Sequence, residues 1–67
     1  MLSARNQFQG IVKTVKLGEV MAEVVVAVGG LEIVSAITRG SAESLGLKPG
    51  DQVKAIIKST EVMIDKP

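Results

Sequence analysis

Two short polar segments, one near each end of the 67-residue chain, contain the residues best suited to bind a ligand. Residues 3–7 (SARNQ) carry a hydroxyl at Ser3 and a guanidinium at Arg5, which share one face if the segment is extended. Residues 58–60 (KST) place an ammonium group and two hydroxyls where an apolar alternating run ends, so backbone N–H groups released from a sheet would join them. Such a set of donors suits a small dianion, which must replace its lost hydration with hydrogen bonds.

The same two segments also have a plainer interpretation. A serine and an arginine near a terminus are usually solvated, and Lys-Ser-Thr after a strand is usually a turn. Spacing alone therefore leaves anion binding and simple solvation as open alternatives.

The residue types needed for catalysis are scarce. The chain has no His, Cys or Tyr, and its seven carboxylates are scattered along it. A general base, an activated nucleophile or a metal-bound water would need the missing groups, which leaves only a carboxylate pair assembled by folding. We therefore expect no enzyme activity, no catalytic residues, no cofactor and no metal ligated directly by protein side chains.

Size and composition predict a single domain over residues 1–67 that needs a partner for stability. A chain this short buries only about 60% of the surface of its unfolded form, and the absence of cysteine excludes disulfides. Hydrophobic residues make up 46% of the sequence, yet Phe8 is the only aromatic residue. Part of this apolar surface is expected to lie between subunits, so the sequence predicts a homo-oligomer.

The net charge of +1 gives the chain no general attraction to nucleic acid or to an acidic membrane. No apolar run approaches the roughly 20 residues that cross a bilayer, and residues 1–7 are too polar for the core of a signal peptide. We therefore expect a cytoplasmic protein without a membrane or nucleic-acid partner.

Alternation of apolar residues predicts that the chain is built mainly from short β-strands. Residues 19–28 are the clearest case, since every even position from Val20 to Val28 is apolar and the β-branched content disfavours a helix. The five predicted strands cover residues 11–17, 19–28, 31–38, 52–58 and 62–64.

Glycine and proline mark the predicted turns. Gly29-Gly30 predicts a tight hairpin, because both residues tolerate positive φ. Residues 48–51 (KPGD) predict a second turn, since proline presets φ and the following glycine supplies a positive φ. Residues 39–47 are the only helical candidate, with Gly40-Ser41 as the expected N-terminal cap and Gly46 as the stop.

Five short strands and one short helix predict an all-β fold, a small OB-type barrel that is closed or partly closed. A flat sheet would leave its edges exposed, and either barrel closure or the pairing of edges between subunits removes that problem. The exact topology does not follow from the pattern.

Several blocks of the sequence resemble the molbindin (Mop) family, small molybdate-binding proteins whose unit also occurs as the TOBE domain of molybdate transporters and molybdate-responsive regulators. The first block is residues 3–10 (SARNQFQG) and the last is residues 55–63 (AIIKSTEVM). Residues 36–38 (AIT) and 44–50 (SLGLKPG) match between them, although the Leu-Gly-Leu-Lys-Pro-Gly turn is common in β-proteins. The resemblance covers essentially the whole chain in the family's order.

The resemblance implies a five-stranded OB-type barrel that exchanges strands in a dimer, with three dimers assembled into a hexamer. It implies binding of molybdate and tungstate between subunits, for intracellular storage and homeostasis. Ser3 and Arg5 would come from one chain and Lys58 and Ser59 from its partner, while Thr38 would add a hydroxyl. The remaining candidates would contribute backbone groups or support. The full set of implied oxyanion-binding residues is Ser3, Ala4, Arg5, Asn6, Thr38, Lys58, Ser59 and Thr60.

Two alternatives stand beside oxyanion binding. Small OB-type barrels often bind single-stranded nucleic acid, but this needs exposed aromatic side chains and a basic groove, and the chain has one Phe and a net charge of +1. The other alternative is a purely structural oligomerisation module.

Overall fold

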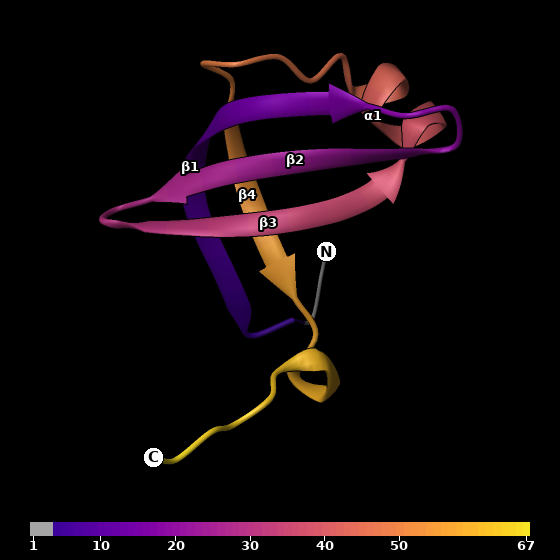
Figure 1. The fold of residues 1–67 in the computed structure, drawn as a ribbon. Coiled ribbons are helices and arrows are strands. Elements are labelled where there is room, and N and C mark those ends of the chain that lie inside the picture. The colour runs from indigo at the N-terminus through magenta and orange to yellow at the C-terminus, as the bar shows by residue number, and fades with distance from the viewer. Residues whose placement is uncertain (1–3) are drawn as a thin grey trace.

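The computed structural model describes residues 4–67 of the chain. Four strands, one α-helix and one 3-10 turn follow one another in this part of the chain (Figure 1). Their bounds are β1 Asn6–Leu17, β2 Met21–Val28, β3 Leu31–Thr38, α1 Arg39–Leu45, β4 Gln52–Ile57 and η1 Ser59–Glu61. The prediction of a mainly β fold with one short helix is confirmed. Neither helix in the described chain has the length and apolar character needed to cross a membrane.

The four strands form one antiparallel sheet in the order β3-β2-β1-β4. β1 belongs to two strand pairs, because its first half, from Asn6 to Ile11, pairs with β4 and its second half pairs with β2. A β-bulge between Val12 and Thr14 lies where one pairing gives way to the other, and bulges bend a strand and increase its twist. The sheet therefore curls into a partly closed barrel, whose edge strands β3 and β4 do not pair with each other (Figure 1).

The hydrophobic core of this barrel is small. Val12, Val24 and Val26 are its buried centre. In β2 the buried residues are Ala22, Val24 and Val26, which confirms the period-two prediction for those even positions. Val20, the first even position of the predicted strand, lies before β2 begins and is exposed. The half-buried residues that pack against the centre are Val15, Val28, Ile37, Leu47 and Val53.

The turns use the predicted glycines. Gly29 has a φ of +58° in the hairpin between β2 and β3, and Gly50 has a φ of +94° in the turn before β4. Gly46 ends α1 in the left-handed conformation, where the absence of a Cβ removes the steric cost.

The predicted N-terminal cap of the helix is wrong. The cap is Thr38 instead of Gly40-Ser41, and the Thr38 side chain accepts a hydrogen bond from the backbone N–H of Ser41. The helix begins at Arg39, directly where β3 ends, so the capping residue is the last residue of that strand.

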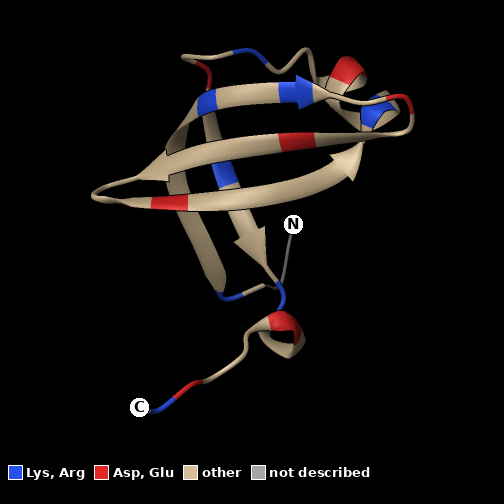
Figure 2. Ribbon diagram, viewed as in Figure 1, with Lys and Arg blue, Asp and Glu red and all other residues tan. Residues whose placement is uncertain are grey.

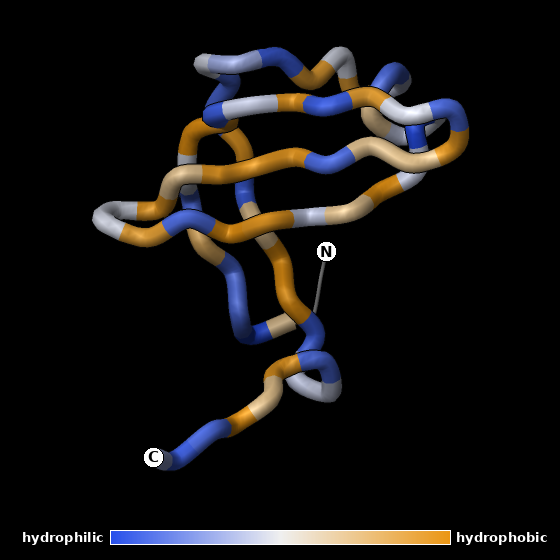
Figure 3. Tube along the Cα trace, in the orientation of Figure 1, coloured by the Kyte–Doolittle hydropathy of each residue, from blue (hydrophilic) through white to orange (hydrophobic). Residues whose placement is uncertain are grey.

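The predicted fifth strand over residues 62–64 is also wrong, so the described chain has four strands instead of five. After β4 the chain forms η1, and the residues from Val62 onward are exposed and extend away from the barrel (Figure 3). A strand needs a neighbouring edge to pair its backbone N–H and C=O groups. Within residues 4–67 this tail pairs with neither free edge of the sheet, and residues 62–64 stay unpaired although all three are apolar.

Candidate functional site

Pairing of β1 with β4 brings the two polar segments to the same end of the sheet. The register places Asn6 opposite Ile57. Arg5 directly precedes this pair on one segment and Lys58 directly follows it on the other, so both residues flank the end of the β1–β4 pair, at one end of the sheet (Figure 1). The fold therefore joins two cationic residues that are far apart in the sequence.

The candidate residues at this end, which we call the cationic end, are accessible to a ligand. Neither Arg5 nor Lys58 takes part in an ion pair within residues 4–67, since the three ion pairs found there join other residues. Figure 2 shows basic positions on both segments at this end of the sheet, and an acidic position in the turn that follows β4. Two unpaired positive charges create a local potential that attracts an anion. Arg5, Lys58, Ser59 and Thr60 are exposed, and Ala4 and Asn6 are half-buried.

Two predicted site residues are not part of this cluster as the structure describes it. Ser3 lies outside the described residues. Thr38 ends β3 opposite Met21, beside the turn that follows β1, and thus lies near the opposite end of β1 from Arg5. One chain alone does not bring Thr38 to the cationic end.

The Thr38 hydroxyl already has two partners. Its Oγ1 accepts a hydrogen bond from the backbone N–H of Ser41 at 3.0 Å and donates one to the Ser41 Oγ at 2.8 Å. A hydroxyl has a single proton to donate. Thr38 would therefore have to release the Ser41 Oγ before it donated to an anion.

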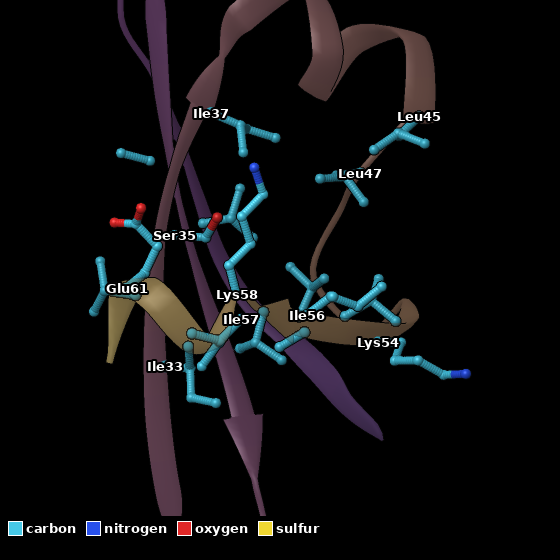
Figure 4. A pocket seen from close by; sticks show the side chains of 17 residues that line it. Ile33, Ser35, Ile37, Leu45, Leu47, Lys54, Ile56, Ile57, Lys58 and Glu61 are labelled. Carbon is cyan, nitrogen blue, oxygen red and sulfur yellow. The ribbon is translucent and has the colours of Figure 1, made fainter. Parts of the chain in front are cut away.

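A largely aliphatic groove of about 650 Å³ lies between the two unpaired sheet edges, and we call it the β3–β4 groove. The polar side chains in its lining are those of Ser35, Lys54, Lys58 and Glu61. Figure 4 shows the Lys58 side chain reaching toward β3, whereas the Lys54 ammonium points away from the other lining residues. Lys58 thus belongs both to the cationic end and to the groove.

Ser35 and Glu61 were not among the predicted site residues. Ser35 interrupts the half-buried row of β3 between Ile33 and Ile37. A polar residue on the apolar face of a strand can be recognised in the sequence, so Ser35 could have been predicted as a candidate. Glu61 closes η1, three residues after Lys58. No feature of the sequence predicted a 3-10 turn at that place, so the position of Glu61 in the lining of the groove was not foreseen.

The turn before β4 supports the bend of β1 without belonging to the cationic end. The Gly50 N–H donates to the Val12 carbonyl oxygen, and the Val12 N–H donates to the Asp51 carbonyl oxygen, so the turn is bound to the bulge. The Lys48 ammonium donates to the Asp51 carboxylate at 2.9 Å and the Lys48 backbone N–H donates to it at 3.0 Å. These two hydrogen bonds lower the pKa of the Asp51 carboxyl.

Comparisons with known proteins agree with this fold and indicate a family. The TOBE domain model matches residues 2–64. Molybdenum-pterin-binding protein 3 of Clostridium pasteurianum is 52% identical over 64 residues, which are 94% of this chain and 94% of that protein.

Solved structures lead to the same family. A molybdate-binding protein from Sporomusa ovata has a TM-score of 0.94 and 42% identity, with 98% of each chain covered. The cytoplasmic molybdate-binding protein ModG, with molybdate bound, has a TM-score of 0.83 and 48% identity over 88% of this chain and 43% of its own. The chain therefore belongs to the TOBE domain family and, within it, to the molbindin (Mop) group of molybdenum-pterin-binding proteins.

Proposed function

We propose that this protein binds molybdate at the cationic end of its sheet and holds the anion without transforming it. The observation that carries the proposal is the adjacency of Arg5 and Lys58, two cations without an ion-pair partner in the described chain. A dianion placed between them exchanges its hydration for charge-assisted hydrogen bonds. The molybdate-binding relatives support molybdate as the anion, and they favour oxyanion binding over the nucleic-acid and scaffold alternatives.

The proposed contacts come from the two polar segments. Arg5 and Lys58 supply the positive potential, and the hydroxyls of Ser3 and Ser59 donate directly to the oxyanion. Thr38 joins the site only from a neighbouring subunit, because its own chain places it elsewhere. Ala4, Asn6 and Thr60 support these contacts. They contribute backbone groups or hold the contacting residues in position.

We also propose that residues 1–67 are one Mop/TOBE-like unit of a homo-oligomer, and that the anion site lies between its subunits. Two features support association: the β3–β4 groove exposes aliphatic side chains between unpaired edges, and the tail leaves Met63 93% and Ile64 88% exposed. Apolar surface of this kind is stabilised by burial against a partner. In a strand-exchanged dimer, one of the two polar segments at the site would come from the partner chain. Arg5 of one chain would then lie near Lys58 of the other. Three such dimers would form the proposed hexamer.

Selectivity should follow from the size of the site and the number of its donors. Molybdate and tungstate share charge, shape and radius, whereas sulfate is smaller, so a cavity with donors at set positions accepts the first two and binds sulfate poorly. Reversible binding of this kind serves intracellular storage and homeostasis of molybdenum. We place the protein in the cytoplasm, with the oxyanion as its ligand and no further cofactor.

The deciding experiment is isothermal titration of the purified protein with molybdate, tungstate and sulfate, after light scattering has determined its mass. Saturable binding of molybdate and tungstate with little binding of sulfate, by a protein of hexameric mass, is the expected result. A well-folded protein that takes up none of the three anions would refute oxyanion binding. A monomeric mass would refute the proposal of a site between subunits.

A further inference from the structure

Glu61 is the carboxylate nearest in the sequence to the proposed anion ligand Lys58, and η1 places it on the same side of the chain. Lys58 is the capping residue of this 3-10 turn and Glu61 is its last residue. The Glu61 N–H donates to the Lys58 carbonyl oxygen at 2.9 Å, which closes the turn. Lys58 itself has an extended backbone and directly precedes the first residue of η1, so both side chains leave the same short segment without forming an ion pair.

Both side chains also line the β3–β4 groove. Figure 4 shows them extending from the segment after β4 in the same general direction, toward β3. Among the described residues that line the groove, Glu61 is the only acid. The negative charge nearest to Lys58 in this groove is therefore that of Glu61.

The charge of Glu61 is not neutralised by a partner in the described chain. The three ion pairs within residues 4–67 join Lys13 to Glu32, Arg39 to Glu43 and Lys48 to Asp51. Glu61 and Lys58 are thus two free charges of opposite sign on one short turn. Each reduces the potential that the other presents to a ligand.

We infer that Glu61 sets the affinity of the anion site, by acting as an intramolecular competitor of the oxyanion for Lys58. The inference rests on the proposed function, which makes Lys58 an anion ligand. In the empty site the Glu61 carboxylate offsets part of the Lys58 charge. An arriving dianion meets a weaker attraction and the repulsion of a like charge, so it binds less tightly and leaves more readily. A store that must return its anion gains this reversibility from one acidic residue.

Isothermal titration with sodium molybdate tests the inference on the full chain in its assembled state. Glu61→Gln removes the charge and keeps the size of the side chain, and it should tighten molybdate binding by about two- to five-fold, the range expected for one solvent-accessible charge interaction. Glu61→Asp keeps the charge and should stay near the wild type. Glu61→Lys reverses the charge and should tighten binding beyond Glu61→Gln. Added sodium chloride should narrow these differences, because salt screens exposed charges.

Glu32→Gln is the matched control, since Glu32 is an exposed acid near the start of β3, at the other end of that strand from Thr38 and away from the cationic end. It changes the net charge equally and should leave the affinity unchanged. Equal affinities of wild type, Glu61→Gln and Glu61→Lys would overturn the inference, as would equal tightening by Glu32→Gln, which would indicate an effect of net charge alone. Weaker binding by Glu61→Gln would overturn it too, since Glu61 would then support the site. Failure of the wild type itself to bind molybdate would instead refute the proposed function.

Discussion

Gly10 lies so close to Ala27 that a Cβ on Gly10 would be 2.5 Å from the Ala27 carbonyl oxygen. The same Cβ would be 2.7 Å from the Val26 side chain and 2.9 Å from that of Val28. β1 therefore approaches β2 at this point more closely than any side chain would permit. The approach occurs just before the bulge, where β1 passes from pairing with β4 to pairing with β2. The bend that joins the cationic end to the core thus depends on a glycine.

Gly10→Ala should destabilise the protein by about 1–3 kcal/mol, because the added methyl group meets backbone and packed valine side chains that have little room to move. Urea unfolding of the variant and the wild type measures the difference in the free energy of unfolding. Both proteins are compared at the same concentration, because the stability of an associating protein depends on concentration. Gly30→Ala is the control, since a Cβ there meets nothing within 4 Å and Gly30 has no positive φ. Equal stabilities of the two variants would show that the close approach is not needed.

Thr38→Ala should destabilise the protein by about 0.5–2 kcal/mol, because α1 loses the hydroxyl that accepts from the Ser41 N–H. Thr38→Ser keeps a capping hydroxyl and should recover most of this loss. Thermal or urea unfolding of the two variants gives the comparison. If serine and alanine at position 38 were equally damaging, the methyl group of Thr38 and not its hydroxyl would be the stabilising part.

Asp51 makes a contribution to stability that acid removes. Because hydrogen bonds from Lys48 hold the pKa of the folded carboxyl below its ordinary value of 3.8, the folded state favours the carboxylate. This contribution is present above the ordinary value and is lost as the pH falls through the lowered pKa of the folded state. The stability of Asp51→Asn should therefore decrease less than that of the wild type between neutral and strongly acidic pH.

Urea unfolding at a series of pH values measures this acid-dependent part. Asp65→Asn provides the comparison, because Asp65 lies on the exposed tail and has no ion pair within residues 4–67. It should follow the pH dependence of the wild type. If Asp51→Asn kept the pH dependence of stability that the wild type shows, the Lys48 contacts would not act through protonation of the Asp51 carboxyl.

Arg5→Ala and Lys58→Ala should each weaken molybdate binding by about tenfold or more, since each removes a charge-assisted hydrogen bond or the potential that attracts the dianion. Both should leave the oligomer assembled, which light scattering checks. Lys54→Ala is the control, because Lys54 is an exposed lysine of β4 that points away from the other groove residues. Unchanged affinity in both Arg5→Ala and Lys58→Ala would remove these residues from the site.

Salt separates a buried anion from one held on an open surface. If subunits enclose the molybdate, raising the ionic strength should weaken binding only modestly, because buried charges are screened less than exposed ones. Titration of the wild type at two salt concentrations gives the answer. A steep loss of affinity would point to an exposed, nonspecific patch instead of an enclosed site.

The local sequence determined which segments form most of the strands and where the chain turns. Ala22, Val24 and Val26 are buried because alternate residues of a strand face the same side, a periodicity that is written directly into the sequence. Gly46 and Gly50 end a helix and complete a turn because their conformations need a residue without a Cβ. The donor types of the candidate site, including Arg5 and Lys58, were also readable, since hydrogen-bonding capacity belongs to each side chain.

Tertiary structure decided what these local signals leave open, because strand pairing depends on contacts between distant residues. β1 begins at Asn6, in a polar stretch without apolar alternation, because β4 pairs with that stretch. Residues 62–64 are apolar as in the predicted strand, but in the described chain they pair with neither free edge of the sheet, so they form no strand. The same pairing places Arg5 beside Lys58, while the end of β3 commits Thr38 to the cap of α1 at another place. Local chemistry therefore identified the candidate donors, and the register of one antiparallel pair determined which of them lie at the same end of the sheet.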